Sequence, residues 1–271
     1  MAALVVLVGC GNMGFAMLSG WISSGKLEPH EVHIVEPNDV LRERAATLGA
    51  HVSATASELA ADVQPTLVIF AVKPQVMRDV VPQYARFAKG QTTFLSIAAG
   101  TGIKLFEDIL GANAAVIRCM PNTPSAIGKG MMVTFANKNV SKGAAEFVAD
   151  LLSASGEVAS IDSEGLMDAV TAVSGSGPAY IFHFIECLTA AGEHVGLPHD
   201  TAKLLAMQTV YGAASLAAES DETPTRLREQ VTSPNGTTAA ALGVLMGGDR
   251  LKELVTEAVE AARDRGIELG K

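Results

Sequence analysis

The first residues of the chain that could do chemistry form a glycine-rich turn. The segment Gly9-Cys10-Gly11-Asn12-Met13-Gly14 follows the apolar run 4–8, which is typical of a buried strand, and opens the helical pattern 15–24. In a Gly-x-Gly-x-x-Gly pattern the first glycine allows a tight turn, the second lets the backbone approach a pyrophosphate, and the third lets helix pack on strand. The free N–H groups and the dipole of the helix then favour negative charge. The spacing predicts a dinucleotide-binding turn; a purely structural strand-to-helix turn is the alternative.

A carboxylate at the end of the second predicted strand bears on which dinucleotide would bind. Glu36 lies about twenty residues after Gly14, where an acid binds the adenosine ribose hydroxyls and selects NAD. No arginine follows it at once to hold a 2′-phosphate, because Arg42 and Arg44 lie one helical turn further on. Glu36 on its own therefore favours NAD over NADP, unless it is only a solvated loop acid.

Two further strand ends add residues to the predicted cofactor site. The strand 66–72 ends in Ala71-Val72-Lys73-Pro74, and the ligands of open α/β sheets lie beyond the carboxyl ends of the strands. Lys73 is therefore expected to contact phosphate or ribose. The alternative is an exposed lysine before a helix, without a role in binding. After the strand 92–97, Ala98 and Ala99 offer the bare surface that a nicotinamide ribose requires.

The elements that must position these residues alternate between strand and helix over residues 1–161. Strand patterns cover 4–8, 31–35, 66–72, 92–97 and 115–118, with two more at one edge, 131–135 and 156–161; helical patterns cover 15–24 and 40–48. This alternation predicts a Rossmann-like α/β domain with a doubly wound parallel sheet.

Residues 162–271 are expected to form a second, all-helical domain. Helical patterns cover 164–195, with a break at Ser174-Gly175-Ser176-Gly177-Pro178, then 201–218, a short helix from Thr223-Pro224, 237–246 and 249–269. Asp200 and Thr223 are the expected N-caps of two of them. The helices are apolar on more than one face, which predicts an intimate homodimer; a single self-contained helical core is the alternative.

Composition excludes several classes of partner. Of 271 residues, 48% are hydrophobic and only 18% charged, which suits a chain that buries surface between subunits as well as a core. The net charge of −9 without a basic run argues against nucleic-acid binding. Three scattered cysteines and no metal-ligand spacing argue against a disulfide framework or a metal site and favour the cytoplasm. No run is long and apolar enough to predict a signal peptide or a membrane span.

Three more motifs go beyond a generic nucleotide-binding chain. They are Arg118-Cys119-Met120-Pro121-Asn122-Thr123-Pro124 after the fifth strand, Asp168-Ala169-Val170-Thr171-Ala172-Val173-Ser174-Gly175-Ser176-Gly177-Pro178-Ala179-Tyr180 across the helix break, and Val231-Thr232-Ser233-Pro234-Asn235-Gly236-Thr237-Thr238 between two helices. With the glycine-rich turn and Ala71-Val72-Lys73-Pro74, they make the chain resemble pyrroline-5-carboxylate reductase. The resemblance covers nearly the whole chain, with the motifs in order and at the right spacings.

The resemblance implies an activity and residues for it. It implies reduction of L-1-pyrroline-5-carboxylate to L-proline by hydride transfer from NAD(P)H; NADPH is the commoner donor in the family while Glu36 favours NAD, so the choice stays open. It implies that Thr237 and Thr238 bind the substrate carboxylate, that the Thr238 hydroxyl meets the ring nitrogen as the catalytic group, and that Glu164 and Gln230 line the substrate site. It also implies a dimer with interlocked helical domains, which can assemble further into a decamer.

The loop before the predicted helix 237–246 suits a carboxylate on physical grounds. Ser233 and Gly236 belong to a small polar segment whose N–H groups and hydroxyls can form an anion nest, although a capped helix–helix turn would look similar. Asn235 stands where the family usually has glycine, and asparagine tolerates left-handed backbone angles, so we expect the turn to survive. Ser176 could face the nicotinamide or the substrate, or it could serve only in helix packing at the break. Asn122 is expected to border the nicotinamide, with a structural proline-rich turn as the alternative.

Two rival functions make different demands on the sequence. A β-hydroxyacid dehydrogenase would need a lysine on the long helix near the break, and residues 171–183 contain none. A non-enzymatic nucleotide sensor would keep the glycine-rich turn but would have no use for the carboxylate loop.

Overall fold

The computed structural model describes residues 4–270, which divide into two compact units, 4–176 with 262–270 and 177–261. An eight-stranded sheet of order β3-β2-β1-β4-β5-β6-β7-β8 forms the centre of the first unit. Its strands are β1 Val5–Val8, β2 Val32–Val35, β3 His51–Ser53, β4 Leu67–Phe70, β5 Thr93–Ser96, β6 Ala115–Met120, β7 Gly130–Ala136 and β8 Gly156–Ser160. The doubly wound Rossmann-like sheet predicted from the sequence is confirmed.

Two features of this sheet are absent from the sequence prediction. The edge strand β3 was not predicted, because a three-residue His-Val-Ser segment carries almost no strand signal. Strand β7 runs antiparallel to β6, whereas every other neighbouring pair is parallel. The connection 121–129 is too short for the crossover of about a dozen residues that a parallel pair needs.

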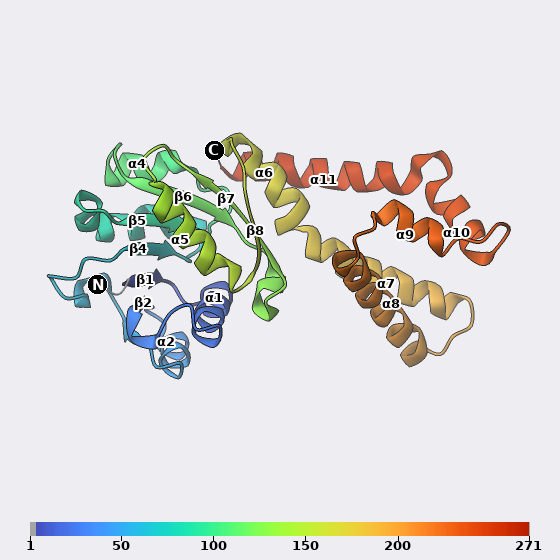
Figure 1. The fold of residues 1–271 in the computed structure, drawn as a ribbon, viewed down its shortest axis with the longest axis horizontal. Helices are drawn as coiled ribbons and strands as arrows, with labels where there is room; N and C mark the ends of the chain where they lie inside the picture. Colours follow the sequence, from blue (N-terminus) through green and yellow to red (C-terminus); the bar gives the residue numbers. More distant parts are fainter. Residues whose placement is uncertain (1–3, 271) are drawn as a thin grey trace. The chain divides into compact units, whose positions relative to one another are not determined.

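Helices cover both faces of the sheet in a three-layer arrangement (Figure 1). One core contains Val5 and Leu7 of β1 together with side chains of α1 Asn12–Ser23, α2 Asp39–Ala46 and α5 Lys142–Ser153. The other contains Val6 and Val8 of the same strand with side chains of α3 Met77–Val80, the following 3₁₀ segment Val81–Lys89 and α4 Ile103–Leu110. Both faces of β1 are therefore buried, which explains its uninterrupted apolar sequence.

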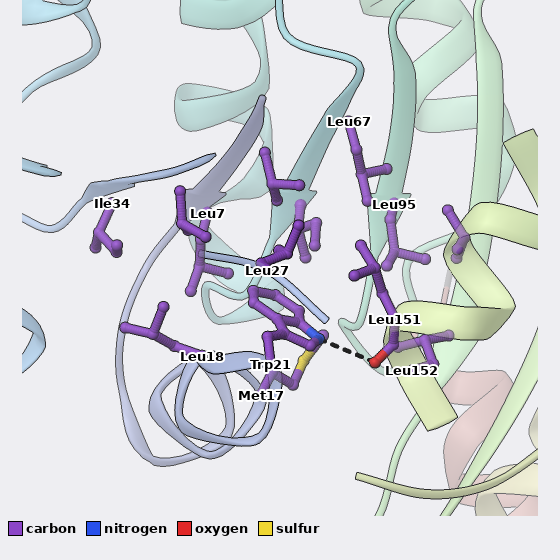
Figure 2. Packing of buried hydrophobic residues seen from close by; sticks show 14 of the residues in the cluster. Leu7, Met17, Leu18, Trp21, Leu27, Ile34, Leu67, Leu95, Leu151 and Leu152 are labelled. Carbon is purple, nitrogen blue, oxygen red and sulfur yellow. Dashed lines mark hydrogen bonds between the residues drawn. The ribbon is translucent and has the colours of Figure 1, made fainter. Parts of the chain in front are cut away.

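The helix that follows the glycine-rich turn is held in place by a tryptophan. Trp21 of α1 is wholly buried, and its indole Nε1 donates to the carbonyl oxygen of Leu151 in α5 at 3.0 Å (Figure 2). A buried indole N–H needs such a partner, so this bond fixes α1 against α5 as well as filling the core.

The first of the two segments of this unit, 4–176, ends in a distorted helix. α6 Met167–Val170 continues into a π-helical turn, Thr171–Gly175, closed by a hydrogen bond from the Ser176 N–H to the Thr171 oxygen at 2.8 Å. The break predicted at residues 174–178 is therefore present. The two compact units divide after Ser176, and the domain boundary expected after residue 161 stays a prediction.

The second unit is helical. It contains α7 Gly177–His194, α8 His199–Glu219, α9 Pro224–Gln230, α10 Thr237–Met246 and the first part of α11 Arg250–Leu269, whose last turns belong to the first unit. The Thr223 hydroxyl caps α9 by accepting from the Arg226 N–H, as expected. The prediction for α8 was wrong, because its N-cap is Pro198 and Asp200 lies within the first turn, where a carboxylate also favours the helix dipole.

The helical unit has almost no core of its own. Among its residues, all of which the structure describes, only Ala202 and Ala206 are buried. Large apolar side chains are exposed instead, among them Ile181, Phe182, Phe184, Leu204, Leu205, Met207, Tyr211, Leu216, Val244, Leu245, Met246, Leu251, Leu254 and Val255. A self-contained helical core, the alternative left open by the sequence, is therefore excluded.

Candidate active site

The predicted cofactor residues of the first unit meet at one edge of the sheet. Gly9 follows β1, Glu36 follows β2, Ala71-Val72-Lys73-Pro74 follows β4, Ala98 comes soon after β5, and Asn122 comes soon after β6. These five strands are neighbours and run parallel, so their carboxyl ends lie together. The turn after β1 sits where the strand order reverses, which is where open α/β sheets bind their ligands.

The three glycines of the turn have separate structural reasons. Gly9 has a φ of +88°, and a Cβ there would lie 2.8 Å from the Ala71 oxygen. A Cβ on Gly14 would lie 2.5 Å from the Gly9 oxygen, so only glycine lets α1 approach the turn this closely. A Cβ on Gly11 would meet nothing within 4 Å. The turn therefore leaves open space at Gly11, beside an α1 N-terminus that no side chain caps, and this fits the pyrophosphate of a dinucleotide.

Glu36 is fixed at the end of β2 by backbone donors. It is 6% exposed, one carboxylate oxygen accepts from the Cys10 N–H at 2.7 Å, and the other accepts from the Asn38 N–H at 2.9 Å. Each oxygen retains a lone pair, so the carboxylate can still accept from ribose hydroxyls. The acid is thus a structural part of the turn and not a solvated loop residue.

Sequence reasoning missed Arg44 as part of this site. Its Nη2 donates to the Cys10 oxygen at 2.9 Å and to the Gly11 oxygen at 3.2 Å, and its guanidinium lies over the Phe15 ring, 4.2 Å from the centroid. Arg44 therefore holds the carbonyls of the turn toward α2. The sequence offers no signal for this contact beyond a positive charge one helical turn past Glu36.

The residues that follow β4 and β5 are mostly small. Ala71 and Val72 are half-buried, Lys73 is exposed, and Pro74 begins a short 3₁₀ turn. Ala98 is buried and Ala99 is exposed, as a bare binding surface would require.

Asn122 and Ser176 lie in the first unit at its distorted helix. The Asn122 amide nitrogen donates to the Ser174 oxygen at 3.2 Å, and its amide oxygen accepts from the Met131 N–H at 2.9 Å. Ser176 is half-buried and ends the π-helical turn. Both polar ends of Asn122 are thus used within the protein, and its expected place beside the nicotinamide stays a prediction.

Glu164 is part of an ionic cluster. One of its oxygens accepts from Arg118 Nη1 at 2.7 Å and from the Ile103 N–H at 2.8 Å, at the start of α4. Arg118 is nearly buried within β6, where a charge needs a partner. The predicted strand 115–118 ends in Arg118, which could have suggested that this arginine needs an acidic partner, but the sequence does not say which acid.

The other predicted substrate residues lie in the second unit. Gln230 ends α9 and is exposed, the loop follows, and Gly236 is the N-cap of α10, whose first residues are Thr237 and Thr238. No side chain caps α10, so its first N–H groups are available to an anion.

The loop itself has the expected geometry. Asn235 has a φ of +58°, so asparagine does take the left-handed conformation where the family usually has glycine. The Gly236 N–H donates to the Ser233 oxygen at 3.1 Å, and a Cβ on Gly236 would lie 2.4 Å from the Ser233 hydroxyl. A side chain at 236 would therefore displace the Ser233 hydroxyl and crowd the turn.

The thiol in the cofactor turn is inert. Burial raises the pKa of Cys10 to about 11, so it stays protonated at neutral pH and is no nucleophile. Within residues 4–270 no group of three or more His, Cys, Asp or Glu side chains is placed to hold a metal ion, and no helix is long and apolar enough to cross a membrane.

Known families match both parts of the chain. A family described as "Pyrroline-5-carboxylate reductase dimerisation" matches residues 164–269. One described as "NADP oxidoreductase coenzyme F420-dependent" matches residues 4–100.

Curated relatives match the whole chain. The pyrroline-5-carboxylate reductase of Pseudomonas aeruginosa is 38% identical over 98% of this chain and 97% of that protein. The one from Synechocystis is 40% identical over the same shares.

Solved structures agree with these relatives. The pyrroline-5-carboxylate reductase of Coxiella burnetii superposes with a TM-score of 0.94 at 34% identity, covering 100% of both chains. The Plasmodium falciparum enzyme, solved with NADP bound, gives a TM-score of 0.83 at 29% identity over 99% of this chain and 98% of that chain. The chain therefore belongs to the pyrroline-5-carboxylate reductase family of oxidoreductases, which form proline.

Proposed function

We propose that this protein reduces L-1-pyrroline-5-carboxylate to L-proline, using a nicotinamide dinucleotide held at the turn 9–14 and a carboxylate nest at the start of α10. The observation that carries the proposal is the presence of two helices, α1 and α10, that begin at a glycine with no side-chain cap. One such terminus suits a pyrophosphate and the other suits the substrate carboxylate. The acidic chain therefore needs no cationic side chain at either position.

The dinucleotide would be held by residues of the first unit. The open space at Gly11 and the N–H groups of Asn12 and Met13 would receive the pyrophosphate, and Glu36 would accept from the adenosine ribose. Lys73, after the neighbouring strand β4, would contact phosphate or ribose, and Ala98, after β5, would contact the nicotinamide ribose. The bound cofactor supplies a hydride to the carbon of the C=N bond.

The substrate would be oriented first by the start of α10. Thr237 and Thr238 offer N–H groups and hydroxyls to the carboxylate. A threonine hydroxyl is a weak acid, so Thr238 orients the ring N–H of the protonated imine, which accepts hydride better than the neutral form. Gln230 and Ser176 would line the site. One oxygen of Glu164 binds Arg118 and Ile103, and its other oxygen, which no described residue bonds, would face the substrate.

We propose NADH as the preferred donor. A 2′-phosphate would meet the fixed carboxylate of Glu36, and both nearby arginines are already engaged. Arg42 donates to the backbone carbonyl oxygen of Glu36 at 2.9 Å and pairs with Asp39 at 2.5 Å, while Arg44 donates to the carbonyls of the turn. Both guanidinium groups already donate to acceptors of the protein, and the buried Glu36 carboxylate would oppose the extra phosphate charge.

The exposed apolar faces of the helical unit support a homodimer as the working form, and further assembly to a decamer is an extension of that proposal. A monomer with so much exposed apolar surface would aggregate. Cys10, Cys119 and Cys187 are free thiols, which suits a reducing cytoplasm.

The direct test follows absorbance at the nicotinamide band with pyrroline-5-carboxylate and each reduced cofactor. We expect turnover with both donors and a higher kcat/KM with NADH. Turnover of a β-hydroxyacid with the oxidised cofactor, in the absence of turnover of pyrroline-5-carboxylate with either reduced cofactor, would reject the proposed activity. Cofactor binding without turnover of either substrate would reject it as well. A higher kcat/KM with NADPH would reject only the cofactor preference.

A further inference from the structure

We propose that Asn122 is a positioning residue, which replaces the backbone donor missing at Pro178 and thereby fixes the turn through which the chain leaves the first unit. Its kinetic consequence rests on the proposed function, whereas its structural consequence does not.

The proposal starts from a missing hydrogen bond. In a regular helix the N–H of residue 178 would donate to the carbonyl of residue 174, but proline has no N–H. The Ser174 oxygen therefore lacks the donor that a regular α-helix would supply, and an unmet buried carbonyl costs stability. The Asn122 amide nitrogen lies 3.2 Å from this oxygen and supplies the donor from outside the helix.

The orientation of the Asn122 amide is settled by its other end. Its oxygen accepts from the Met131 N–H at 2.9 Å, and only an oxygen can do so. The NH₂ group must therefore be the end that faces Ser174. Aspartate at this position would retain the bond to Met131 but would set a second oxygen against the Ser174 carbonyl.

The turn that Asn122 holds lies against the cofactor side of the first unit. A Cβ on Gly175 would come within 2.6 Å of Met120 Cε, so the turn is in close contact with the end of β6. The 3₁₀ segment Thr123–Ile127, directly after Asn122, packs on α1. Asn122 thus ties the π-helical turn to the helix that carries the dinucleotide turn.

The hydrogen bond from Asn122 bears on the reaction because the π-helical turn that it holds is followed by Ser176, a predicted substrate residue, and contains Ser174. The Ser174 hydroxyl is buried and has no partner in the part of the chain that the structure describes. If Asn122 is lost, the turn loosens while the glycine-rich turn and Glu36 are untouched. We expect kcat to fall and KM for the imine to rise.

The test measures hydrogen exchange of residues 171–177 in Asn122→Ala, Pro178→Ala and the double variant. Asn122→Ala should speed exchange of this segment roughly three- to tenfold, the effect of one lost hydrogen bond. In Asn122→Ala/Pro178→Ala the new N–H at 178 can serve the Ser174 oxygen, so exchange should return toward the wild-type rate. If Asn122→Ala folds poorly, Asn122→Asp can take its place. Aspartate also lacks the donor to the Ser174 oxygen, so we expect the same increase in the exchange rate of residues 171–177.

Asn139→Ala is the matched control. Like Asn122, Asn139 uses its amide nitrogen to donate to backbone carbonyls, here those of Ala112 and Ala114. These bonds lie before the start of β6, whereas Asn122 follows the end of that strand. Asn139→Ala should lower overall stability without changing exchange at 171–177. Equal exchange in wild type, Asn122→Ala and Asn122→Asp, or no recovery in the double variant, would overturn the proposal. If the wild-type protein were inactive toward pyrroline-5-carboxylate, the proposed function would be overturned. The role of Asn122 in holding the π-helical turn would still be tested by the exchange rates.

Discussion

Arg118 and Glu164 form an ion pair in which Nη1 lies 2.7 Å from Oε1, with side chains only 10% and 32% exposed. The pair joins β6 to the segment that leads into α6, and the same oxygen also caps the start of α4 through the Ile103 N–H. Three elements of the first unit therefore depend on one carboxylate.

We expect Arg118→Met to lower the free energy of unfolding by about 1–3 kcal/mol, because it leaves the carboxylate partly buried without its charge partner. Arg118→Met/Glu164→Gln should lose less than the sum of the two single variants, since removing both charges leaves neither unpaired. Urea unfolding of the four proteins measures the coupling. Additive losses within about 0.3 kcal/mol would show that the two side chains do not stabilise each other.

The glycine-rich turn offers a matched pair of substitutions. Gly11→Ala places a methyl group in open space and should leave the melting temperature near that of the wild type while weakening dinucleotide binding. Gly14→Ala forces a Cβ to 2.5 Å from the Gly9 oxygen and should destabilise the fold itself. Thermal melts and energy transfer from Trp21, the single tryptophan, to bound reduced nicotinamide separate the two effects. Unchanged dinucleotide affinity in Gly11→Ala would contradict the assignment of the turn.

Local patterns explain why so much of the first unit could be predicted. The strands β1 and β4 are continuous apolar runs because both their faces are buried, and Gly9 has its positive φ where the motif requires one. The left-handed turn at Asn235 was likewise expected, from the resemblance of the loop to that of the family and the tolerance of asparagine for such angles. In each case the signal lies within a few neighbouring residues.

Contacts between distant residues could not be predicted in this way. Arg44 reaches the carbonyl of Cys10, and Asn122 reaches that of Ser174, across long stretches of sequence. The side chain types permit many such partners, and only the packing of α2 and of the π-helical turn selects one. The direction of β7 likewise depends on a loop length, not on the residues of the strand.

Cofactor preference should respond to the charge of Glu36. Glu36→Gln keeps an oxygen that can accept from one backbone N–H but removes the negative charge that faces a 2′-phosphate. We expect the ratio of kcat/KM for NADPH to that for NADH to rise roughly tenfold, about 1.4 kcal/mol. Steady-state kinetics with both donors measure the ratio, and Glu58→Gln, which replaces an exposed acid of the same unit, is the control. An unchanged ratio in Glu36→Gln would remove this residue from cofactor selection.

Two buried thiols should make the protein sensitive to alkali. Burial raises the pKa of Cys10 to about 11 and that of Cys119 to about 12, from an ordinary value of 9.0. The folded state therefore holds these protons more tightly than the unfolded chain, and stability declines as pH rises from 9 toward 11 and 12. Burial also raises the pKa of Tyr84, which adds to the loss.

Urea unfolding at pH 8, 9 and 10.5 measures this decline. The stability of Cys10→Ala/Cys119→Ala should be lower at pH 8, where its core has lost two side chains, but should fall less between pH 9 and 10.5. A decline as steep as that of the wild type would show that the two thiols do not set the alkaline limit.

Thr238 is expected to act on the reaction and not on the fold. It is half-buried at the start of α10, and no residue in the described chain bonds its hydroxyl. Thr238→Ala should therefore retain the wild-type circular dichroism and melting temperature while kcat falls by up to about a hundredfold, the effect of a misoriented substrate.

Thr238→Ser and Thr237→Ala separate orientation by the hydroxyl from binding by the loop. Serine keeps the hydroxyl and should recover most of the rate, whereas Thr237→Ala leaves the Thr238 hydroxyl in place and should mainly raise KM for the substrate. If the proton reached the ring nitrogen from the threonine hydroxyl itself, the pH profile of kcat would change shape in Thr238→Ala; if the hydroxyl only orients the protonated imine, the profile keeps its shape and falls uniformly. Near wild-type turnover in Thr238→Ala would exclude both mechanisms, because the carboxylate nest alone would then suffice to position the ring.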